Sequence, residues 1–577
     1  MKQFFKIMLA TMCGLLLFCI VGTCVLTGAI GAIASQSSDT ETKLKAHSVY
    51  QIKLSGVLVE QAENDEYEAA LAEALGRKTT SQIGLNDILD NIKKAKEDPN
   101  IDGIYLYGGS LSAGFASMHA IREALQDFRR SGKFVVAYAD NYGQLNYYLA
   151  SVADKVCLNS HGSVNWSGLA TNITFYTRLL EKVGVEMQVV KVGQFKSAVE
   201  PYMLTHMSDS NREQMTILLD DIWQEVLKDV SASRKISVKQ LNRYADMNLG
   251  FQDENLLPSY GIVDTLVYIQ DMKAILTELT GTKDYKLVSH SSMNNVPSSN
   301  KYKKDKIAIL YAEGDISDDG TSGIVGKKFV KQIDKLREKD NIKAVVLRVN
   351  SPGGSAYASE QIWNALSRLK KEKPLVVSMG DYAASGGYYI SCVADTILAE
   401  NNTLTGSIGI FGIIPNFGTL RNNIGLDIDG LGTNRLSLMT SNMTAKGMSA
   451  EERAIMQNYI NRGYELFVKR CADGREMTTD QIKKIAEGRV WSGKRALEIG
   501  LVDKIGNLQD AVEIAAQMAN LEKYKVVSYP NKEDKLTKLL NSLSGTDSEE
   551  MILYKQVKSL IEKPAVMARL PYNIEIK

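Results

Sequence analysis

The sequence predicts an α/β protein in which an N-terminal membrane-spanning helix precedes two tandem copies of one strand-and-helix unit. Three features indicate this organisation: a long uncharged apolar stretch at the N-terminus, short apolar strands that alternate with helical patterns, and an internal repeat. Residues 101–184 align with residues 342–425 without a gap, at an offset of 241 (342 − 101). Apolar positions, a pair of tyrosines and a Val-Ala-Asp triplet coincide in the two copies. We therefore expect the same fold twice.

The N-terminal stretch, residues 7–34, carries no charge. As a helix it would be about 42 Å long at ~1.5 Å per residue, enough to cross a hydrocarbon core of about 30 Å. Lys2 and Lys6 lie on its short side, so the positive-inside rule places the rest of the chain outside the cytoplasm. The alternative is a cleaved signal peptide ending near Ala34, but the apolar region of such peptides is only about 7 to 15 residues long. We expect residues 1–38 to be an uncleaved anchor.

Composition shifts divide the remaining chain. We expect a first repeat over residues 48–288, a polar linker over residues 289–304 and a second repeat over residues 305–527. Residues 528–577 form a lysine-rich tail whose sequence indicates no function.

The overall composition argues against several classes of function. Lysine plus arginine (68) balances aspartate plus glutamate (67), so nothing electrostatic points to a nucleic-acid partner. The six cysteines show no paired spacing, so neither a disulfide framework nor a metal site is expected. We expect no cofactor.

The first motif that could carry a catalytic residue is a turn of small residues after an apolar run. Residues 375–379 are mostly apolar, and a helical pattern opens just after Ser385. A serine at a strand-to-helix turn projects its Oγ from the tip, and the unpaired NH groups and the dipole of the helix favour negative charge there. Small-residue turns that hold a buried structural serine are also common. Ser385 is a candidate nucleophile.

A second motif lies upstream. Residues 342–349 read as a buried strand that runs into Asn350–Ser355, Asn-Ser-Pro-Gly-Gly-Ser. Pro352 fixes φ and the following glycines leave a backbone NH open, as an oxyanion hole requires, although an ordinary Pro-Gly turn has the same composition. We expect the NH groups of Gly354 and Gly386 to be the oxyanion donors.

These motifs occur in the order typical of one protein superfamily. The segments RVNSPGGS, GDYAASGGYYIS and TGSIGIFG resemble the Clp protease and crotonase superfamily, and within it the long two-repeat form of the signal peptide peptidase A (protease IV) family. The similarity covers about residues 48–527. It implies that each repeat has the ββα spiral fold of Clp proteases and crotonases.

The two copies differ where the chemistry would lie. The position that matches Ser385 in the first copy is Gln144, and the glycine pair is replaced by Ser112 and Ala113. No histidine follows Ser385, so a Ser-His-Asp triad would need a distant histidine.

The resemblance implies a lysine base instead. The family motif G-x-x-K-S-A-x-E-P occupies residues 193–201 and implies that Lys196 of the first repeat serves Ser385 of the second. An amine can act as a base near neutral pH only if burial lowers its pKa, and an arginine such as Arg435 could not do so. Ser407 is a plausible hydroxyl for orienting the amine, although it could equally be a turn residue.

The resemblance implies a single-pass serine endopeptidase of the bacterial inner membrane with its catalytic portion on the periplasmic face. Its substrates would be remnant signal peptides left in the lipid bilayer after secreted proteins are released, and it would form a homotetramer. Two alternatives stay open from the residues alone. A crotonase-like acyl-CoA enzyme would not react with a fluorophosphonate. With a catalytically silent membrane scaffold, peptide turnover would not change when Ser385 is replaced.

Overall fold

The computed structural model describes residues 41–62, 81–297, 304–320, 322–530 and 566–569, with isolated positions at Lys6 and Gly14. Apart from those two positions, the predicted anchor lies outside these residues, as does most of the predicted tail. Among the residues that are described, no helix is both long and apolar enough to span a bilayer.

The first repeat is built on a parallel seven-stranded sheet. Its strands are β1 (Ser48–Val59), β2 (Gln82–Gly84), β3 (Ile101–Ser112), β4 (Phe134–Ala139), β5 (Lys155–Leu158), β7 (Thr265–Leu266) and β8 (Lys286–Val288). They are ordered β2-β1-β3-β4-β5-β7, with β8 beside β1. The central strand β4 is almost wholly buried, which explains why it reads as a continuous apolar run.

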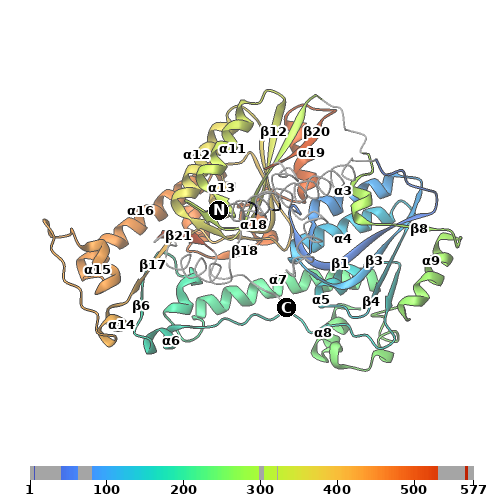
Figure 1. Ribbon diagram of the computed structural model, residues 1–577, viewed down its shortest axis with the longest axis horizontal. Helices are drawn as coiled ribbons and strands as arrows, with labels where there is room; N and C mark the ends of the chain where they lie inside the picture. Colours follow the sequence, from blue (N-terminus) through green and yellow to red (C-terminus); the bar gives the residue numbers. More distant parts are fainter. Residues whose placement is uncertain are drawn as a thin grey trace.

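Helices cover this sheet and extend beyond it (Figure 1). They are α3 (Leu85–Glu97), α4 (Phe115–Arg129), α5 (Gln144–Ala150), α6 (Thr177–Lys182), α7 (Asp209–Arg234), α8 (Val238–Asp246), α9 (Met272–Thr280) and α10 (His290–Asn294), with the 3-10 helix η1 (Ser197–Tyr202) before α7. The predicted linker begins with α10, which packs on α3 and β1. The domain boundaries themselves stay predictions.

The second repeat is built on an eight-stranded sheet. Its strands are β9 (Lys306–Glu313), β12 (Ile342–Ser351), β14 (Leu375–Ala384), β15 (Thr396–Ala399), β16 (Leu404–Gly406), β18 (Val490–Ser492), β19 (Lys504–Ile505) and β20 (Lys525–Tyr529). The main path runs β18-β16-β14-β12-β9-β20, and all pairs are parallel except β16 with β18.

The helices of the second repeat follow the same plan as those of the first. They are α11 (Gly326–Glu338), α12 (Ala356–Lys370), α13 (Gly386–Ser391), α14 (Gly418–Asn423), α15 (Met439–Ala445), α16 (Ala450–Arg475), α17 (Thr479–Ile485), α18 (Gly493–Glu498) and α19 (Leu508–Met518). Helix α4 begins at Phe115 and α12 at Ala356, and α7 begins at Asp209 and α16 at Ala450. Both pairs keep the offset of 241 (356 − 115; 450 − 209), which confirms the internal repeat.

A third, six-stranded sheet joins the two repeats. It contains β6 (Glu186–Lys191), β10 (Ile316–Ser317), β11 (Ile324–Val325), β13 (Gly353–Ser355), β17 (Phe411–Asn416) and β21 (Val566–Arg569). The order is β11-β10-β13-β21-β17-β6, so a strand of the first repeat pairs with one of the second. In Figure 1, α7 and β6 reach from the first repeat to β17 of the second. The repeats therefore interlock.

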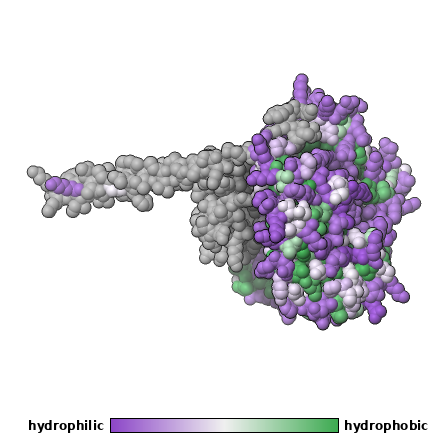
Figure 2. All heavy atoms as spheres, turned by 90° about the vertical axis from the view of Figure 1, so that its right-hand side faces the viewer, coloured by the Kyte–Doolittle hydropathy of each residue, from purple (hydrophilic) through white to green (hydrophobic). Residues whose placement is uncertain are grey.

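Buried polar contacts also connect the repeats. Arg348 donates through Nε to Oε2 of Glu60 over 2.9 Å, and the two side chains are only 3% and 1% exposed. Asp381 accepts hydrogen bonds from the backbone NH and the hydroxyl of Ser117. By contrast, the face of the first repeat in Figure 2 is mostly hydrophilic with scattered apolar residues.

The Glu60–Arg348 pair gives the first testable prediction. In Arg348→Met, Glu60 keeps its burial but loses its cation, so the free energy of unfolding should fall by about 3–5 kcal/mol in denaturant titrations. Arg368→Met is the control, because Arg368 forms a partly exposed pair with Asp334, and a change of about 1 kcal/mol or less is expected there. Equal losses in the two variants would contradict the proposed role of the buried pair.

Candidate active site

Ser385 lies at the junction of β14 and α13. Its backbone has φ 56° and ψ −112°, an unusual conformation for a residue with a side chain. The conformation is held by hydrogen bonds from the Ser385 NH to the Gly406 carbonyl (2.8 Å) and from the Tyr389 NH to the Ser385 carbonyl (2.8 Å). The predicted strand-to-helix turn is therefore present, and Ser385 is fully buried.

Lys196 reaches Ser385 from the first repeat. It lies between β6 and η1, and the neighbouring Phe195 NH donates to the carbonyl of Glu487 in the second repeat over 2.9 Å. The Lys196 Nζ is 2.8 Å from Ser385 Oγ, 2.9 Å from Ser407 Oγ and 3.1 Å from the Ser407 carbonyl oxygen. The structure thus brings together three of the residues that the sequence singled out.

The environment of the amine favours its neutral form. Lys196 is 0% exposed, and burial alone lowers its pKa from the usual 10.5 to about 7. A neutral amine has two hydrogens and one lone pair. The carbonyl and the hydroxyl oxygen of Ser407 can accept the two hydrogens, since the Ser407 hydroxyl itself donates to the Gly488 carbonyl over 3.2 Å. The lone pair is then left for the hydroxyl of Ser385.

Glycines allow the chain to pack tightly around Lys196. A Cβ on Gly488, where φ is +76°, would lie 2.6 Å from the Lys196 Cβ. A Cβ on Gly409 would be 3.0 Å from the Gly488 Cα and 3.4 Å from the Lys196 Cδ. Gly488 and Gly409 are site residues that sequence reasoning missed. A lone glycine in a loop carries no signal of which side chain it packs against.

Glu200, another residue of the lysine motif, has a structural role. It is buried and accepts hydrogen bonds from the hydroxyl and NH of Ser208 and from the side-chain amide of Asn211. Ser208 is the N-cap of α7. The carboxylate therefore fixes the segment after Lys196 to the start of the long helix.

The glycines expected to form the oxyanion hole lie on adjoining elements. Gly354 is in β13, which contacts α13, the helix that begins at Gly386. A Cβ on Gly354 would lie 2.0 Å from the Ile316 carbonyl oxygen, and one on Gly387 would lie 2.7 Å from the Ser351 carbonyl oxygen. Glycine is therefore required for this close backbone packing beside Ser385.

The matching position in the first repeat has no nucleophile. Gln144 begins α5, where its amide nitrogen donates to the Gly168 carbonyl and its amide oxygen accepts from the NH groups of Ser167 and Gly168. These hydrogen bonds hold the turn in place.

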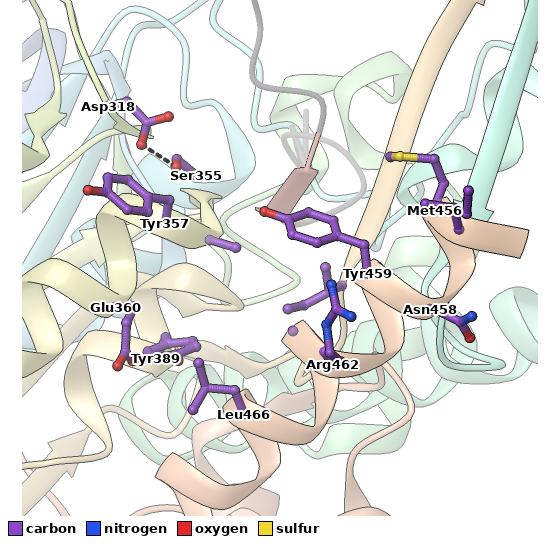
Figure 3. Close-up of a pocket in the computed structure, with 14 residues that line it drawn as sticks. Asp318, Ser355, Tyr357, Glu360, Tyr389, Met456, Asn458, Tyr459, Arg462 and Leu466 are labelled. Atoms are coloured by element: carbon purple, nitrogen blue, oxygen red, sulfur yellow. Dashed lines mark hydrogen bonds between the residues drawn. The ribbon is translucent and has the colours of Figure 1, made fainter. Parts of the chain in front are cut away.

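A cavity of about 870 Å³ borders β13. In Figure 3, Tyr357 and Glu360 line it from α12, while Tyr459, Arg462 and Leu466 line it from α16. Its wall also includes Ser355, the last residue of β13, whose hydroxyl donates to Asp318 (Figure 3), and Ile410, which precedes β17. The cavity is mainly apolar and lies next to the two strands that flank the site.

Comparison with known families identifies the family and the fold. Residues 127–283 and 367–522, one stretch in each repeat, match peptidase family S49. The chain belongs to peptidase family S49. Residues 300–401 also match the Clp protease family, so the α/β fold is Clp-protease-like with two tandem S49 repeats.

Curated relatives cover most of the chain. Protease 4 of Salmonella typhi is 37% identical over 562 residues, which cover 94% of this chain and 90% of that protein. Protease 4 of Haemophilus influenzae is 35% identical, covering 84% of this chain and 81% of that protein. The chloroplastic serine protease SPPA of Arabidopsis thaliana is 30% identical, covering 85% of this chain and 74% of that protein.

These matches confirm the resemblance seen in the sequence motifs, and the protein is a serine peptidase. This assignment argues against the two alternative interpretations, an acyl-CoA enzyme and a catalytically silent scaffold. Among solved structures, a ClpP1 mutant from Listeria monocytogenes matches 35% of this chain and 94% of its own, at 17% identity and a TM-score of 0.25. That score is too low to support any argument.

The buried amine predicts how stability depends on pH. Between pH of about 7 and 10.5 the unfolded chain keeps the lysine proton that the folded chain has lost. Stability should therefore rise with pH in this window, by roughly 1.4 kcal/mol per pH unit from this group. Lys196→Met removes the titration. Denaturant titration gives the free energy of unfolding of each protein at each pH. The value for the variant minus the value for the wild type should fall by roughly 1.4 kcal/mol per pH unit as pH rises through the window.

Lys446→Met is the matched control, because Lys446 is exposed. Its stability difference from the wild type should stay flat across the same pH range. A flat difference for Lys196→Met as well would contradict a buried amine that is neutral in the folded protein.

Proposed function

We propose that Ser385 and Lys196 form the catalytic dyad of a serine endopeptidase. The observation that carries the proposal is the 2.8 Å separation of Lys196 Nζ and Ser385 Oγ inside a fully buried environment. Neutral Lys196 takes the hydroxyl proton while Ser385 Oγ bonds to the peptide carbonyl carbon. The same proton passes to the leaving amine as the C–N bond breaks, and water then hydrolyses the acyl-enzyme with Lys196 again acting as base.

The NH groups of Gly354 and Gly386 are proposed to bind the oxyanion. Each such donor is typically worth about 2.7–4 kcal/mol of transition-state stabilisation. Ser407 is proposed to orient the amine, since it accepts both amine hydrogens and leaves the lone pair for Ser385. Ser407 has a positive φ of 52°, and its carbonyl and hydroxyl oxygens are both within hydrogen-bond distance of the Lys196 Nζ.

The proposed substrates are remnant signal peptides, cut within their apolar cores at a membrane. Two features support this substrate class: the uncharged residues 7–34 preceded by Lys2 and Lys6, and the apolar cavity beside β13. The proposed location is the inner membrane of a bacterium, with a single anchor and the catalytic portion on the periplasmic face.

A homo-oligomer, a tetramer by the family resemblance, is also proposed. Strand β6 pairs with β17 within the chain. The repeat offset makes residues 427–432 the counterpart of β6 and residues 170–175 the counterpart of β17, and neither belongs to a strand of the described chain. Residues 170–175 alternate between exposed and half-buried positions, whereas residues 427–432 are exposed, including Leu431 at 98%. Pairing them between copies would repeat the β6–β17 contact.

The test of the dyad is peptide hydrolysis by variants at both positions. Ser385→Ala and Lys196→Ala should each lower kcat/KM by about 10⁴-fold or more, and the double variant should be hardly worse than either, because the two groups act as a unit. Lys196→Arg should not restore activity, because a guanidinium stays protonated.

Gln144→Ala is the control, since Gln144 occupies the matching turn of the first repeat, and its variant should cleave like the wild type if it folds. Circular dichroism would establish folding for each variant. Cleavage at the wild-type rate by folded Ser385→Ala would overturn the serine assignment. Multiplicative losses in the double variant would show that the two residues act independently.

A further inference from the structure

A histidine and two glutamates from the two repeats meet away from the candidate active site. His119 and Glu123 lie on α4 of the first repeat, and Glu400 directly follows β15 of the second. One potential ligand atom of each side chain lies within 4.8 Å of the other two. His119 and Glu123 are four residues apart on one helix, so both side chains lie on the same face of α4. Glu400 approaches that face, and His119 Nδ1 is 2.9 Å from Glu400 Oε2.

The carboxylate of Glu400 is buried with one oxygen unpaired. Glu400 is 2% exposed, and its Oε1 forms no hydrogen bond within the part of the chain that the structure describes. An ionised carboxylate removed from water is stable only when it is paired with a cation or coordinates a metal ion. Because His119 contacts Oε2, the second oxygen of Glu400 remains available as a ligand.

The negative charge around His119 exceeds what one imidazolium can balance. Besides Glu123 and Glu400, Asp229 Oδ2 lies 3.8 Å from His119 Nε2, and Arg122 Nε is 3.9 Å from the same oxygen. Partial desolvation and then the charge of Glu400 raise the pKa of the Glu123 carboxyl, more than His119 lowers it. The two glutamates therefore repel each other, and a divalent cation between them would relieve this repulsion.

The types of ligand favour a transition-metal ion. An imidazole nitrogen with carboxylate oxygens suits Zn²⁺, whereas Mg²⁺ and Ca²⁺ prefer oxygen ligands alone. Ligand atoms about 2.1 Å from a tetrahedral zinc ion lie about 3.4 Å from one another. Separations of up to 4.8 Å must then shorten by at most about 1.4 Å (4.8 − 3.4). Glu123 is exposed, so its side chain can rotate to close this distance.

A further carboxylate is placed to orient the histidine. A histidine that binds a metal through one nitrogen usually donates its other NH to a carboxylate or a carbonyl. In this protein Nδ1 of His119 faces Glu400, and Nε2 faces Asp229. Asp229 is itself held by Tyr148, whose hydroxyl donates to Oδ2 over 2.6 Å. The cluster thus has both the ligands of a zinc site and the outer carboxylate that such sites use.

We propose that His119, Glu123 and Glu400 bind one Zn²⁺ ion that holds the two repeats together. The ion would join α4 to the turn after β15. In that turn the Glu400 NH donates to Thr403 Oγ1, and the Thr403 hydroxyl donates to the carbonyl of Gly380 in β14. This role is structural, and it does not depend on the proposed dyad.

The cysteine spacing predicted no metal site, and the proposed ligands leave no local pattern either. His119 and Glu400 are 281 residues apart, so only the fold brings them together.

The first test is zinc binding by the full-length, tag-free protein, stripped of metal with EDTA and then freed of the chelator. Isothermal titration calorimetry with Zn²⁺ should show one site per chain. Glu123→Gln and Glu400→Gln should each weaken the affinity about tenfold or more, because each removes a charged ligand. His161→Gln is the matched control: His161 forms an exposed pair with Glu254 that belongs to no three-ligand group among the described residues. It should bind Zn²⁺ like the wild type.

A second measurement follows thermal unfolding. An ion that binds the folded chain raises its Tm. Excess Zn²⁺ should therefore raise the Tm of the wild type and of His161→Gln but not that of Glu123→Gln. Mg²⁺ at the same concentration should change none of them, because the site includes a nitrogen ligand.

Three results would overturn the proposal. They are no zinc binding by the wild type, equal zinc affinity in the wild type and Glu123→Gln, and a rise in Tm with Mg²⁺ as large as that with Zn²⁺. If buried Glu400→Gln does not fold, exposed Glu123→Gln decides the question. Failure of the dyad is separate, since it would appear as peptide hydrolysis by Ser385→Ala whatever the zinc affinity.

Discussion

The burial of one lysine amine is the constraint on which the candidate site depends. An amine removed from water loses its preference for the charged form, and at Lys196 this lowers the pKa to about 7 with no neighbouring charge as a cause. A carboxylate nearby would reverse the effect by stabilising the cation. The site instead surrounds the amine with hydroxyl and carbonyl oxygens and with the backbone of Gly409 and Gly488. This arrangement destabilises the folded protein and favours the neutral amine that the proposed base requires.

The candidate site divides its parts between the two repeats. Ser385 needs a turn whose NH groups are open, whereas Lys196 needs a segment that can be enclosed from all sides. The second repeat keeps the turn, and the first supplies the lysine through β6, which pairs with β17 and leads directly into η1. In the first repeat the matching turn holds Gln144 in place of a serine, and the Gln144 amide forms hydrogen bonds to the backbone. One site is thus built from two copies of a fold.

Much of this could be predicted from sequence, because the informative patterns are local. The strand-to-helix turn at Ser385 and the glycine segment around Gly354 each depend on a few adjacent residues, and the repeat is visible because residues 101–184 align with residues 342–425 without a gap. Lys196 was found only through a family motif, since its neighbours alone resemble those of many lysines. The pairing of β6 with β17 and the packing of Gly488 on Lys196 were not predicted. Both join segments more than 200 residues apart, and neither leaves a periodic or compositional trace. Strand β21 was missed because four residues are too few for an alternation pattern to be recognised.

The central claim is that buried Lys196 activates Ser385. The most direct measurement is the rate at which a fluorophosphonate labels the full-length protein as a function of pH, with the adduct located by peptide mass spectrometry. The adduct should lie on Ser385, and the labelling rate should rise through a midpoint near pH 7 to an alkaline plateau. In Lys196→Met the rate on the plateau should fall by about 10²-fold or more, because the variant lacks the amine that is neutral there. An adduct on Ser351, Ser355 or Ser391, or an equal labelling rate in Lys196→Met, would contradict the account.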